Sequence, residues 1–158
     1  MKSLSILIPV FNEEESLLAL FSELKKHFKN NVAVEIIFIN DGSSDNSQIL
    51  IEKEISHHSS WKLINLYRNY GKSIALQSGI DISSGELIAT LDSDLQDDPK
   101  ELMNLVNKLN DADVIVGWKK NRLDPLEKRL ASKVFNFFIR IFSGLKICLL
   151  YTSPSPRD

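Results

Sequence analysis

Cysteine is almost absent from this sequence, because Cys148 is the single one among 158 residues. One cysteine excludes an internal disulfide and a zinc site built from several cysteines, and it fits a reducing compartment. An excess of charge of one sign is also lacking: 19 Lys and Arg stand against 21 Asp and Glu, a formal net charge of −2. Such a chain has no global field to attract nucleic acid, so we expect no nucleic-acid partner.

Long hydrophobic runs are lacking too. No stretch reaches the roughly 18 apolar residues of a membrane span. The first residues, "MKSLSILIPVFNEEE", contain an apolar run that is too short for a signal peptide and is interrupted by Pro9. Hydrophobic residues make up 43% and charged residues 25%, as in folded globular proteins. We therefore expect one soluble domain with a sizeable core.

Five short apolar runs predict the strands of a sheet. They are apolar on both faces, which suits a parallel sheet covered by helices on both sides. The runs are residues 4–10, 34–40, 61–67, 86–92 and 113–118. Helical stripes of apolar residues lie between them, within residues 17–28, 49–55, 74–82 and 102–109. This alternation predicts an α/β fold of Rossmann type with a mostly parallel sheet flanked by helices.

A polar turn follows each of the first four predicted strands: "PVFNEEES", "NDGSSDNS", "YRNYGKS" and "DSDLQDD". Ligands of such sheets bind beyond the carboxyl ends of the strands, so all four turns open onto one edge. Each turn alone is also explained by helix caps and turn formers. Ser43 and Ser44 are cap candidates for the second helix, and Pro99 suits the first turn of the fourth. Caps do not require an acidic pair before an Asx- and Gln-rich turn, which favours a binding site.

The acidic pair follows the fourth predicted strand. Asp92 and Asp94 are two residues apart and point the same way in extended backbone, with Gln96 next in phase. Two carboxylates and an amide suit a hard divalent cation that keeps positions for substrate phosphates. Mg²⁺ or Mn²⁺ would remove the repulsion between the carboxylates and stabilise a leaving diphosphate. We therefore predict a metal–diphosphate site, and we interpret Asp97 and Asp98 as helix N-terminal charges.

Four segments together resemble a known family: "SILIPVFNEEESL", "FINDGSSDNS", "NYGKSIALQSGI" and "TLDSDLQDDP". Over roughly residues 3–147, the chain is similar to family-2 glycosyltransferases with the GT-A fold. "DSDLQDDP" and "GWKKNRLDPLEKRLASKVFN" resemble the branch of dolichol-phosphate mannose synthase and bacterial polyprenyl-phosphate glycosyltransferases. The resemblance implies a UDP- or GDP-linked sugar donor, a polyprenyl phosphate acceptor, a Mg²⁺ or Mn²⁺ cofactor and hexosyl transfer at the membrane surface.

The resemblance also implies donor-binding residues. Asp41 would accept a hydrogen bond from the base, and Gly42 would let backbone approach there. Lys72, at the start of a helix, would meet the phosphates together with the positive helix end. Helix capping is the simpler role for Asn12 and Glu13, and a solvated position is the simpler one for Lys72. The remaining donor contacts would come from Pro9, Phe11, Asn12, Glu13, Asp92 and Ser93.

The same resemblance implies the metal ligands and the catalytic groups. Asp94 and Gln96 would be direct ligands of the cation, with Asp92 as the third. Asp92, Asp94 and Arg122 would be the catalytic residues. No catalytic base is expected for a phosphate acceptor, which is already anionic near neutral pH, whereas a sugar hydroxyl acceptor would require a carboxylate.

A basic run follows the fifth predicted strand. A solvated helix face is the usual interpretation of such a run. The carboxyl end of that strand should lie beside the metal site, however, so these cations could hold an acceptor phosphate. Lys119 stands where the family tends to have Arg, and it would bind phosphate as a point charge. The predicted acceptor-phosphate residues are Lys119, Arg122, Arg129 and Lys133.

The segment "KVFNFFIRIFSGLKICLL" is amphipathic. It predicts a helix that either lies in a membrane interface or packs on the rest of the domain. The last residues, "CLLYTSPSPRD", are Ser/Pro-rich and depart from the family. We expect residues 1–147 to be the N-terminal, incomplete part of a GT-A domain and residues 148–158 to be a non-native tail. We expect a peripheral position on the cytoplasmic side of the membrane, with a full-length parent that is membrane-anchored.

Other functions are consistent with parts of the pattern. A family-2 transferase with a saccharide acceptor and an inactive nucleotide-binding fragment both remain alternatives. In haloacid-dehalogenase-like phosphatases the Asp-x-Asp motif follows the first strand and precedes Thr or Val, unlike here. A sugar-nucleotide pyrophosphorylase would show a Gly-rich, basic first loop, whereas "PVFNEEES" contains three acids and no glycine.

Overall fold

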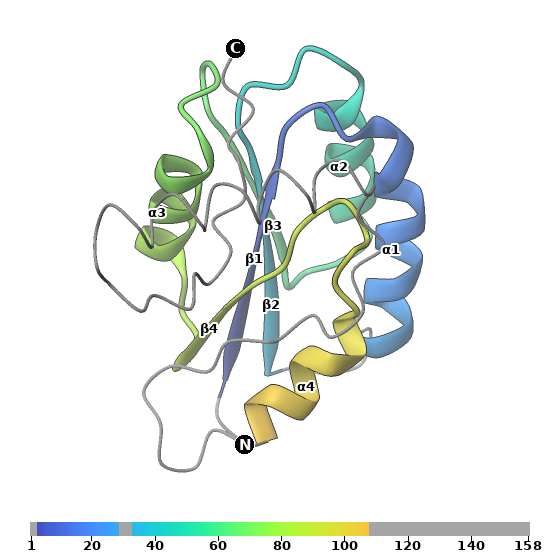
Figure 1. Ribbon diagram of the computed structural model, residues 1–158, viewed down its shortest axis with the longest axis vertical. Helices are drawn as coiled ribbons and strands as arrows, with labels where there is room; N and C mark the ends of the chain where they lie inside the picture. Colours follow the sequence, from blue (N-terminus) through green and yellow to red (C-terminus); the bar gives the residue numbers. More distant parts are fainter. Residues whose placement is uncertain (1–2, 29–32, 108–158) are drawn as a thin grey trace, which may run out of the picture. The chain divides into compact units, whose positions relative to one another are not determined.

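Strands and helices alternate along the chain (Figure 1), in a computed structural model that describes residues 3–28 and 33–107. In chain order they are β1 (Leu4–Val10), α1 (Glu14–Phe28), β2 (Val34–Asn40), α2 (Ser47–Ile55), β3 (Trp61–Asn65), α3 (Lys72–Ile82), β4 (Leu87–Thr90) and α4 (Pro99–Asn107). This order confirms the α/β prediction. Within the described ranges, no helix is both long and apolar enough to cross a membrane.

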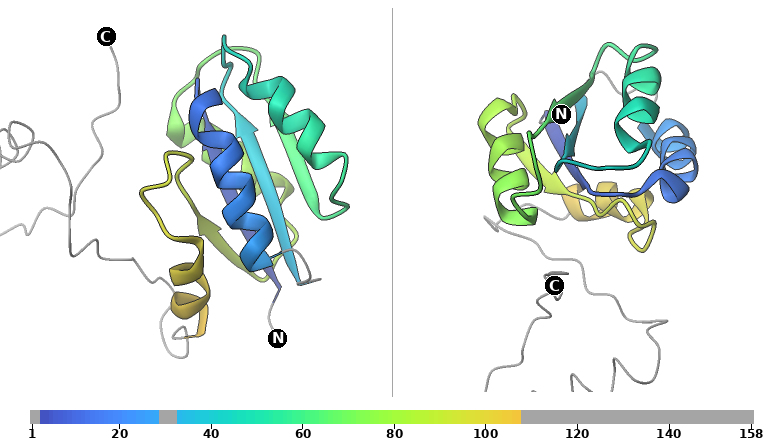
Figure 2. Two further views of the ribbon diagram at one scale, coloured as in Figure 1. Left: turned by 90° about the vertical axis from the view of Figure 1, so that its right-hand side faces the viewer. Right: turned by 90° about the horizontal axis from the view of Figure 1, so that it is seen from above.

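The four strands form one parallel sheet in the order β3-β2-β1-β4. The chain moves outward from β1 to β2 and β3, and then returns to the other side of β1 to form β4. The topological switch point therefore lies between β1 and β4, where ligands of open parallel sheets commonly bind. Figure 2 shows α1 and α2 on one face of the sheet and α3 on the other.

The two central strands, β1 and β2, are buried on both faces, which explains why they are continuously apolar. On one face, Ile6, Ile8 and Phe38 pack with residues of α1 and α2 in the larger core cluster. The rings of Phe21 and Phe38 meet edge to face at 5.6 Å between centroids. On the other face, Leu7, Ile37, Ile39 and Ala75 of α3 form a smaller cluster.

Some predicted details are wrong. Leu18 and Ile49 belong to the predicted stripes but are 65% and 64% exposed. Each is next in sequence to a partly or fully buried residue, and one step rotates a side chain by about 100° around the helix. Ile74, Ile80 and Ile82 of α3 are exposed as well, while Ala75 and Gly79 face the sheet. The third strand ends at Asn65 rather than residue 67, and the fourth spans only Leu87–Thr90.

The predicted serine caps of the second helix are also wrong. Helix α2 begins at Ser47 with Asn46 at the N-cap position, so Ser43 and Ser44 lie too far upstream. The backbone N–H of Ser47 donates to Asp45 Oδ1 at 2.9 Å instead. The predicted strand 113–118 lies outside the described residues.

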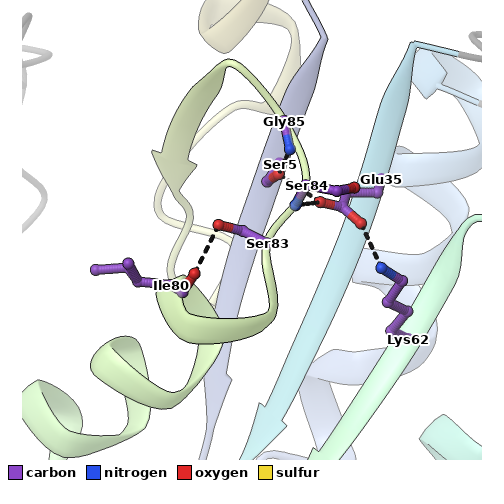
Figure 3. Close-up of polar contacts among 7 residues, drawn as sticks. All are labelled: Ser5, Glu35, Lys62, Ile80, Ser83, Ser84 and Gly85. Carbon is purple, nitrogen blue, oxygen red and sulfur yellow. Dashed lines mark hydrogen bonds and ion pairs between the residues drawn. The ribbon is translucent and has the colours of Figure 1, made fainter.

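The partly buried carboxylate of Glu35 joins the elements at the amino end of the sheet (Figure 3). The Oε1 atom of Glu35 accepts hydrogen bonds from Ser5 Oγ and the backbone N–H of Ser84, each at 2.5 Å. Lys62 Nζ donates to Oε2 at 2.7 Å. A Cβ on Gly85 would lie 2.6 Å from the backbone nitrogen of Ser5, so only glycine fits there. This network fixes the α3–β4 connection against β1, β2 and β3.

Candidate functional site

The polar turns that follow β1, β2 and β3 gather at the carboxyl end of the sheet, opposite the Glu35 network (upper part of Figure 1). Hydrogen bonds join the first two turns. Asn12 Oδ1 accepts the backbone N–H of Ser44 at 2.8 Å, and the backbone N–H of Asn12 donates to Ser43 Oγ at 3.0 Å. Asn12 has a φ of 55°, a left-handed conformation that asparagine tolerates better than most residues. The observed contacts of Asn12 therefore join the loop after β1 to the loop after β2. They differ from the helix cap that was the simpler role expected for Asn12.

Glu13 caps helix α1. Its carbonyl oxygen accepts the N–H groups of Ser16 and Leu17, both at 3.1 Å, and its Oε2 accepts Ser16 Oγ at 2.8 Å. The backbone N–H of Glu13 donates to the buried Ser47 Oγ at 2.9 Å, which links the starts of α1 and α2. Glu13 therefore occupies the N-cap position, although its carboxylate accepts Ser16 Oγ in place of a backbone N–H; its contact with a nucleoside stays a prediction.

A second link between these turns was not predicted from the sequence. Asp45 Oδ2 accepts the backbone N–H of Glu14 at 3.1 Å, and Glu14 Oε2 accepts both the backbone and side-chain N–H groups of Asn46. Burial by itself would raise the pKa of Asp45, but hydrogen bonds from Ser47 and Glu14 lower it below the usual value. The only sequence signal was the density of small polar residues in "NDGSSDNS".

Asp41 is buried, with 4% of its surface exposed, at the end of β2. Its two carboxylate oxygens accept the backbone N–H groups of Tyr70 and Gly71, at 2.8 and 2.9 Å. Asp41 thereby fixes the loop that leads into α3. Each carboxylate oxygen can accept more than one hydrogen bond, so the predicted bond from a base is compatible with this arrangement.

Gly42 lets another backbone segment approach closely. That segment is the protein's own loop between β3 and α3. A Cβ at Gly42 would lie 2.4 Å from the carbonyl carbon of Arg68, and its φ is 71°. Beside it, Asn40 Nδ2 donates to Asn65 Oδ1 at 3.0 Å and Asn40 Oδ1 accepts the N–H of Ser43 at 3.0 Å. The ends of β2 and β3 are therefore held together next to Asp41.

Lys72 and Asp92 connect α3 to the turn after β4. Lys72 Nζ lies 2.5 Å from Asp92 Oδ1, with side-chain exposures of 48% and 37%. Lys72 is therefore ion-paired rather than simply solvated. An exposed pair of this kind adds at most about 1 kcal/mol to stability. Its main consequence is to place an ammonium group at the first turn of α3, close to the acidic turn.

The acidic turn differs from the prediction in one respect. Ser93 and Asp94 lie in a turn rather than in extended backbone, and Leu95 has a φ of 61°. Asp94 Oδ1 accepts the backbone N–H of Gln96 at 3.0 Å. The extended backbone expected for Asp92, Asp94 and Gln96 is therefore wrong, because strand β4 ends at Thr90.

The donor set of this turn still suits a hard cation. The three predicted ligands, Asp92, Asp94 and Gln96, offer two carboxylates and one amide oxygen, the ligand type of Mg²⁺ and Mn²⁺. Among the described residues, no group of three or more His, Cys, Asp or Glu could hold a metal. A cation at this turn would therefore need further oxygens, such as those of a bound diphosphate.

Asp98 has the predicted structural role. Its Oδ1 accepts the backbone N–H of Lys100 at 2.9 Å at the start of α4, and Pro99 is the first residue of that helix. Asp97 Oδ2 faces the backbone N–H of Asp92 at 3.5 Å, which makes it part of the turn. Ser93 is buried with 6% exposed, while Phe11 is 41% exposed and Pro9 half-buried at the end of β1. The predicted acceptor residues Lys119, Arg122, Arg129 and Lys133 lie outside the described part of the chain.

Known proteins resemble this chain in sequence. The family described as glycosyl transferase family 2 matches residues 5–154. Dodecaprenyl-phosphate galacturonate synthase of Rhizobium johnstonii is 36% identical over 149 residues, covering 91% of this chain and 44% of that protein. Undecaprenyl-phosphate 4-deoxy-4-formamido-L-arabinose transferase of Yersinia pestis is 41% identical over 146 residues, covering 90% and 45%. The chain thus spans less than half the length of these curated relatives.

Solved structures resemble it in fold. Mannosyltransferase PcManGT from Pyrobaculum calidifontis, in complex with GDP-Man and Mn²⁺, has a TM-score of 0.63 at 19% identity and covers 70% of this chain and 33% of that one. S. aureus TarS 1-349 in complex with UDP has a TM-score of 0.57 at 19% identity, covering 75% and 40%. These likenesses confirm the expected GT-A fold. Since the family match extends over most of the sequence, the chain belongs to glycosyl transferase family 2.

Proposed function

We propose that this chain binds a UDP- or GDP-linked sugar, and that the whole protein transfers the sugar to a polyprenyl phosphate. The observation that carries the donor site is the Lys72–Asp92 pair beside Asp94 at the switch point of the sheet. This part of the molecule brings together the ammonium group of Lys72, the N-terminus of α3 and the carboxylates of Asp92 and Asp94. These groups suit a diphosphate that arrives with a divalent cation.

The nucleoside would lie at the β1–β2 side of this site. Phe11 and Pro9 offer apolar surface at the end of β1, with Asn12 and Glu13 adjoining them. Asp41 would accept a hydrogen bond from the base while it continues to hold the backbone of Tyr70 and Gly71. Gly42 would contribute indirectly, because its lack of a side chain lets the backbone of Arg68 pack beside it.

The diphosphate would lie toward β4. Mg²⁺ or Mn²⁺ would be held by Asp92, Asp94 and Gln96, and when bound it would offset the charge that develops on the leaving diphosphate. Lys72 would turn from Asp92 to the phosphates, with Ser93 completing the donor contacts. Asp92 and Asp94 would therefore contribute to catalysis by holding the cation that stabilises the leaving diphosphate.

The acceptor would be an anionic phosphate on a polyprenyl chain. One of its oxygens would attack C1 of the sugar, the bond from C1 to the donor diphosphate would break, and the nucleoside diphosphate would leave. Arg122, with Lys119, Arg129 and Lys133, would hold the acceptor phosphate against the repulsion of the donor. The names of the R. johnstonii and Y. pestis relatives, both polyprenyl-phosphate enzymes, support this acceptor.

We also propose where the protein acts and which residues form its domain. A lipid-linked acceptor would require a peripheral position at the membrane, and a nucleotide-sugar donor favours its cytoplasmic side. We retain residues 1–147 as the incomplete GT-A domain and residues 148–158 as a non-native tail. Sequencing the parent gene downstream of Ile147 tests that boundary, because a native continuation identical to residues 148–158 would contradict it.

The test of the proposed function has two stages. Calorimetry on this chain should show Mn²⁺-enhanced binding of UDP or GDP; no nucleotide binding would contradict the donor site. A transfer assay on the full-length protein should then compare a short-chain polyprenyl phosphate with a neutral sugar acceptor. Transfer to the sugar alone would favour the saccharide-acceptor alternative, and donor binding without turnover would favour the inactive binding module.

A further inference from the structure

The start of helix α3 links two turns that follow different strands of the sheet. Asp41 follows β2 and Asp92 follows the end of β4, and β1 lies between those two strands. Lys72, the first residue of α3, contacts Asp92 through its ammonium group. The two residues before Lys72 are hydrogen-bonded to Asp41. The start of α3 is therefore held from both turns.

Two hydrogen bonds fix the backbone that enters α3. The carboxylate oxygens of Asp41, a buried residue, accept the N–H groups of Tyr70 and Gly71 at 2.8 and 2.9 Å. The carbonyl oxygen of Gly71 accepts the N–H groups of Ile74 and Ala75, both at 3.1 Å, and so begins the helix. Gly71 therefore connects the carboxylate of Asp41 directly to the first turn of α3.

Side-chain packing contributes little to the position of Lys72. Residues 72–74 are exposed, and Ala75 is the first residue of α3 that is buried. Ala75 offers a single methyl group to the smaller core cluster on this face of the sheet. The backbone position from which the Lys72 side chain extends therefore depends mainly on the bonds that Asp41 accepts.

The backbone conformation of Gly71 is one that other residues rarely adopt. Its φ is 91° and its ψ is 157°, a region that is essentially restricted to glycine. Among the described residues, no atom lies within 4 Å of the point where a Cβ on Gly71 would be. Space is therefore available for a side chain, and the backbone conformation is what requires glycine. The N–H of Gly71 donates to Asp41 from this conformation.

We propose that Asp41 is a positioning residue for Lys72 and acts through the backbone of Gly71. By holding the start of α3, Asp41 places the Lys72 ammonium where it meets the donor diphosphate, beside Asp92. This role requires no base, so it is separate from the hydrogen bond that Asp41 would accept from one. The inference rests on the proposed donor site and specifies how the turn after β2 supports binding of the phosphates.

The test measures the Kd of inorganic pyrophosphate with Mn²⁺, by calorimetry on the full chain. Pyrophosphate carries no base, so a residue that contacts only the base would not affect this Kd. Lys72→Met should raise the Kd by about tenfold, the loss of one hydrogen bond to a charged group. Asp41→Asn should raise it by about threefold, because its amide has one oxygen in place of the two that hold Tyr70 and Gly71.

The sign of the change separates positioning from a direct effect of charge. Asp41→Asn removes a negative charge, which by itself would favour binding of the pyrophosphate anion. Weaker binding therefore means that the variant has displaced a group that binds phosphate. In the Lys72→Met background, Asp41→Asn should no longer raise the Kd, because the group that Asp41 positions is gone.

Asp45→Asn is the matched control, because it removes the same charge from the same edge of the sheet. Asp45 accepts the backbone N–H groups of Glu14 and Ser47, and so holds the starts of α1 and α2 in place of α3. This variant should not raise the Kd of pyrophosphate. Gly71→Ala is a second test variant, which changes the backbone before Lys72 without changing a charge and should raise the Kd.

Urea unfolding shows whether each variant is folded under the conditions of calorimetry, and Gly71→Ala decides the outcome if Asp41→Asn is not. An unchanged or lower Kd for folded Asp41→Asn would overturn the inference. A loss that persists in the Lys72→Met background, or an equal loss in Asp45→Asn, would overturn it too. A wild type that binds UDP or GDP but not pyrophosphate would overturn the inference alone. A wild type that binds none of the three would overturn the donor site as well.

Discussion

At the scale of single residues, the acidic groups Asp41 and Glu13 have structural tasks at this edge, and of the two only Glu13 was expected from the sequence to have one. Asp41 holds the backbone of Tyr70 and Gly71, and Glu13 caps α1. Neither task consumes all the acceptor capacity of a carboxylate. A substitution of Asp41 or Glu13 would therefore change both the stability of the loop and the affinity for the ligand. The choice of variant decides which of these two effects is measured.

Asp94→Ala should abolish the metal-dependent part of nucleotide-sugar binding and leave the fold intact, because Asp94 is exposed and its one hydrogen bond within the described part of the chain is to Gln96 of its own turn. The measurement is calorimetry with and without Mn²⁺. Asp81→Ala, an exposed acid near the end of α3, is the control and should behave like the wild type. Unaltered Mn²⁺-dependent affinity of Asp94→Ala would refute the metal site.

Asp41→Asn should weaken nucleotide binding by about 1.5–3 kcal/mol, the range for a hydrogen bond to a charged group, with or without Mn²⁺. It should also destabilise the fold by about 1–3 kcal/mol, because an amide cannot accept both backbone N–H groups without leaving one buried donor unpaired. Urea unfolding measures the second effect. If binding is lost only when Mn²⁺ is present, Asp41 belongs to the metal site instead.

At the scale of helices and strands, two networks hold opposite ends of the sheet. The loops after β1 and β2 are joined through Asn12 and Glu14 at the carboxyl end. Glu35 joins β1, β2, β3 and the α3–β4 connection at the amino end. Because α3 runs from one end to the other, Glu35 supports the helix whose first residue, Lys72, reaches Asp92.

Glu35 makes stability depend on acid pH. Burial by itself would raise its pKa, but hydrogen bonds from Lys62, Ser5 and Ser84 outweigh that and lower it from 4.5 to about 2. The folded pKa is below the unfolded one, so the stabilisation is complete above pH 4.5 and is lost as the pH falls toward 2. The shift corresponds to up to about 3 kcal/mol.

Glu35→Gln should therefore unfold more readily at pH 7 and lose less stability than the wild type between pH 4.5 and 2. Urea unfolding across that pH range is the measurement. Glu52→Gln, at an exposed position on α2, is the control and should follow the wild-type curve. Parallel curves for Glu35→Gln and the wild type would show that Glu35 does not cause the pH dependence.

At the scale of the whole molecule, the residues that the structure describes contain the proposed donor site and not the proposed acceptor site. The donor residues lie within one parallel sheet and its loops, whereas the proposed acceptor residues lie beyond residue 107. The chain also spans less than half the length of its curated relatives. Predictions about transfer therefore apply to the full-length protein.

Arg122→Ala in that protein should raise KM for a polyprenyl phosphate by about tenfold, because the lost guanidinium would make charge-assisted bonds to the acceptor. Donor affinity should change little. Initial rates at varied acceptor concentration and calorimetry with the donor separate the two. Normal acceptor kinetics in the variant would contradict the lipid-phosphate role of Arg122.

The sequence by itself determined the α/β class, the first two strands to the residue and the edge at which the polar turns meet. It could do so because strands buried on both faces are continuously apolar, and because parallel strands bring their carboxyl ends together. It also indicated Asp98 and Pro99 as the start of a helix, since helix-starting signals are local.

Only the tertiary structure decided which polar groups contact one another. The bonds of Asn12 to Ser44, of Asp41 to Tyr70 and of Lys72 to Asp92 join residues 20 or more positions apart. Such pairs depend on strand order and loop shape, which local patterns do not contain. The extended backbone expected after β4 was wrong for a different reason: Ser93 and Asp94 lie in a turn, and the hydrogen bonds from Asp92 to Asp97 and from Gln96 to Asp94 are local to it.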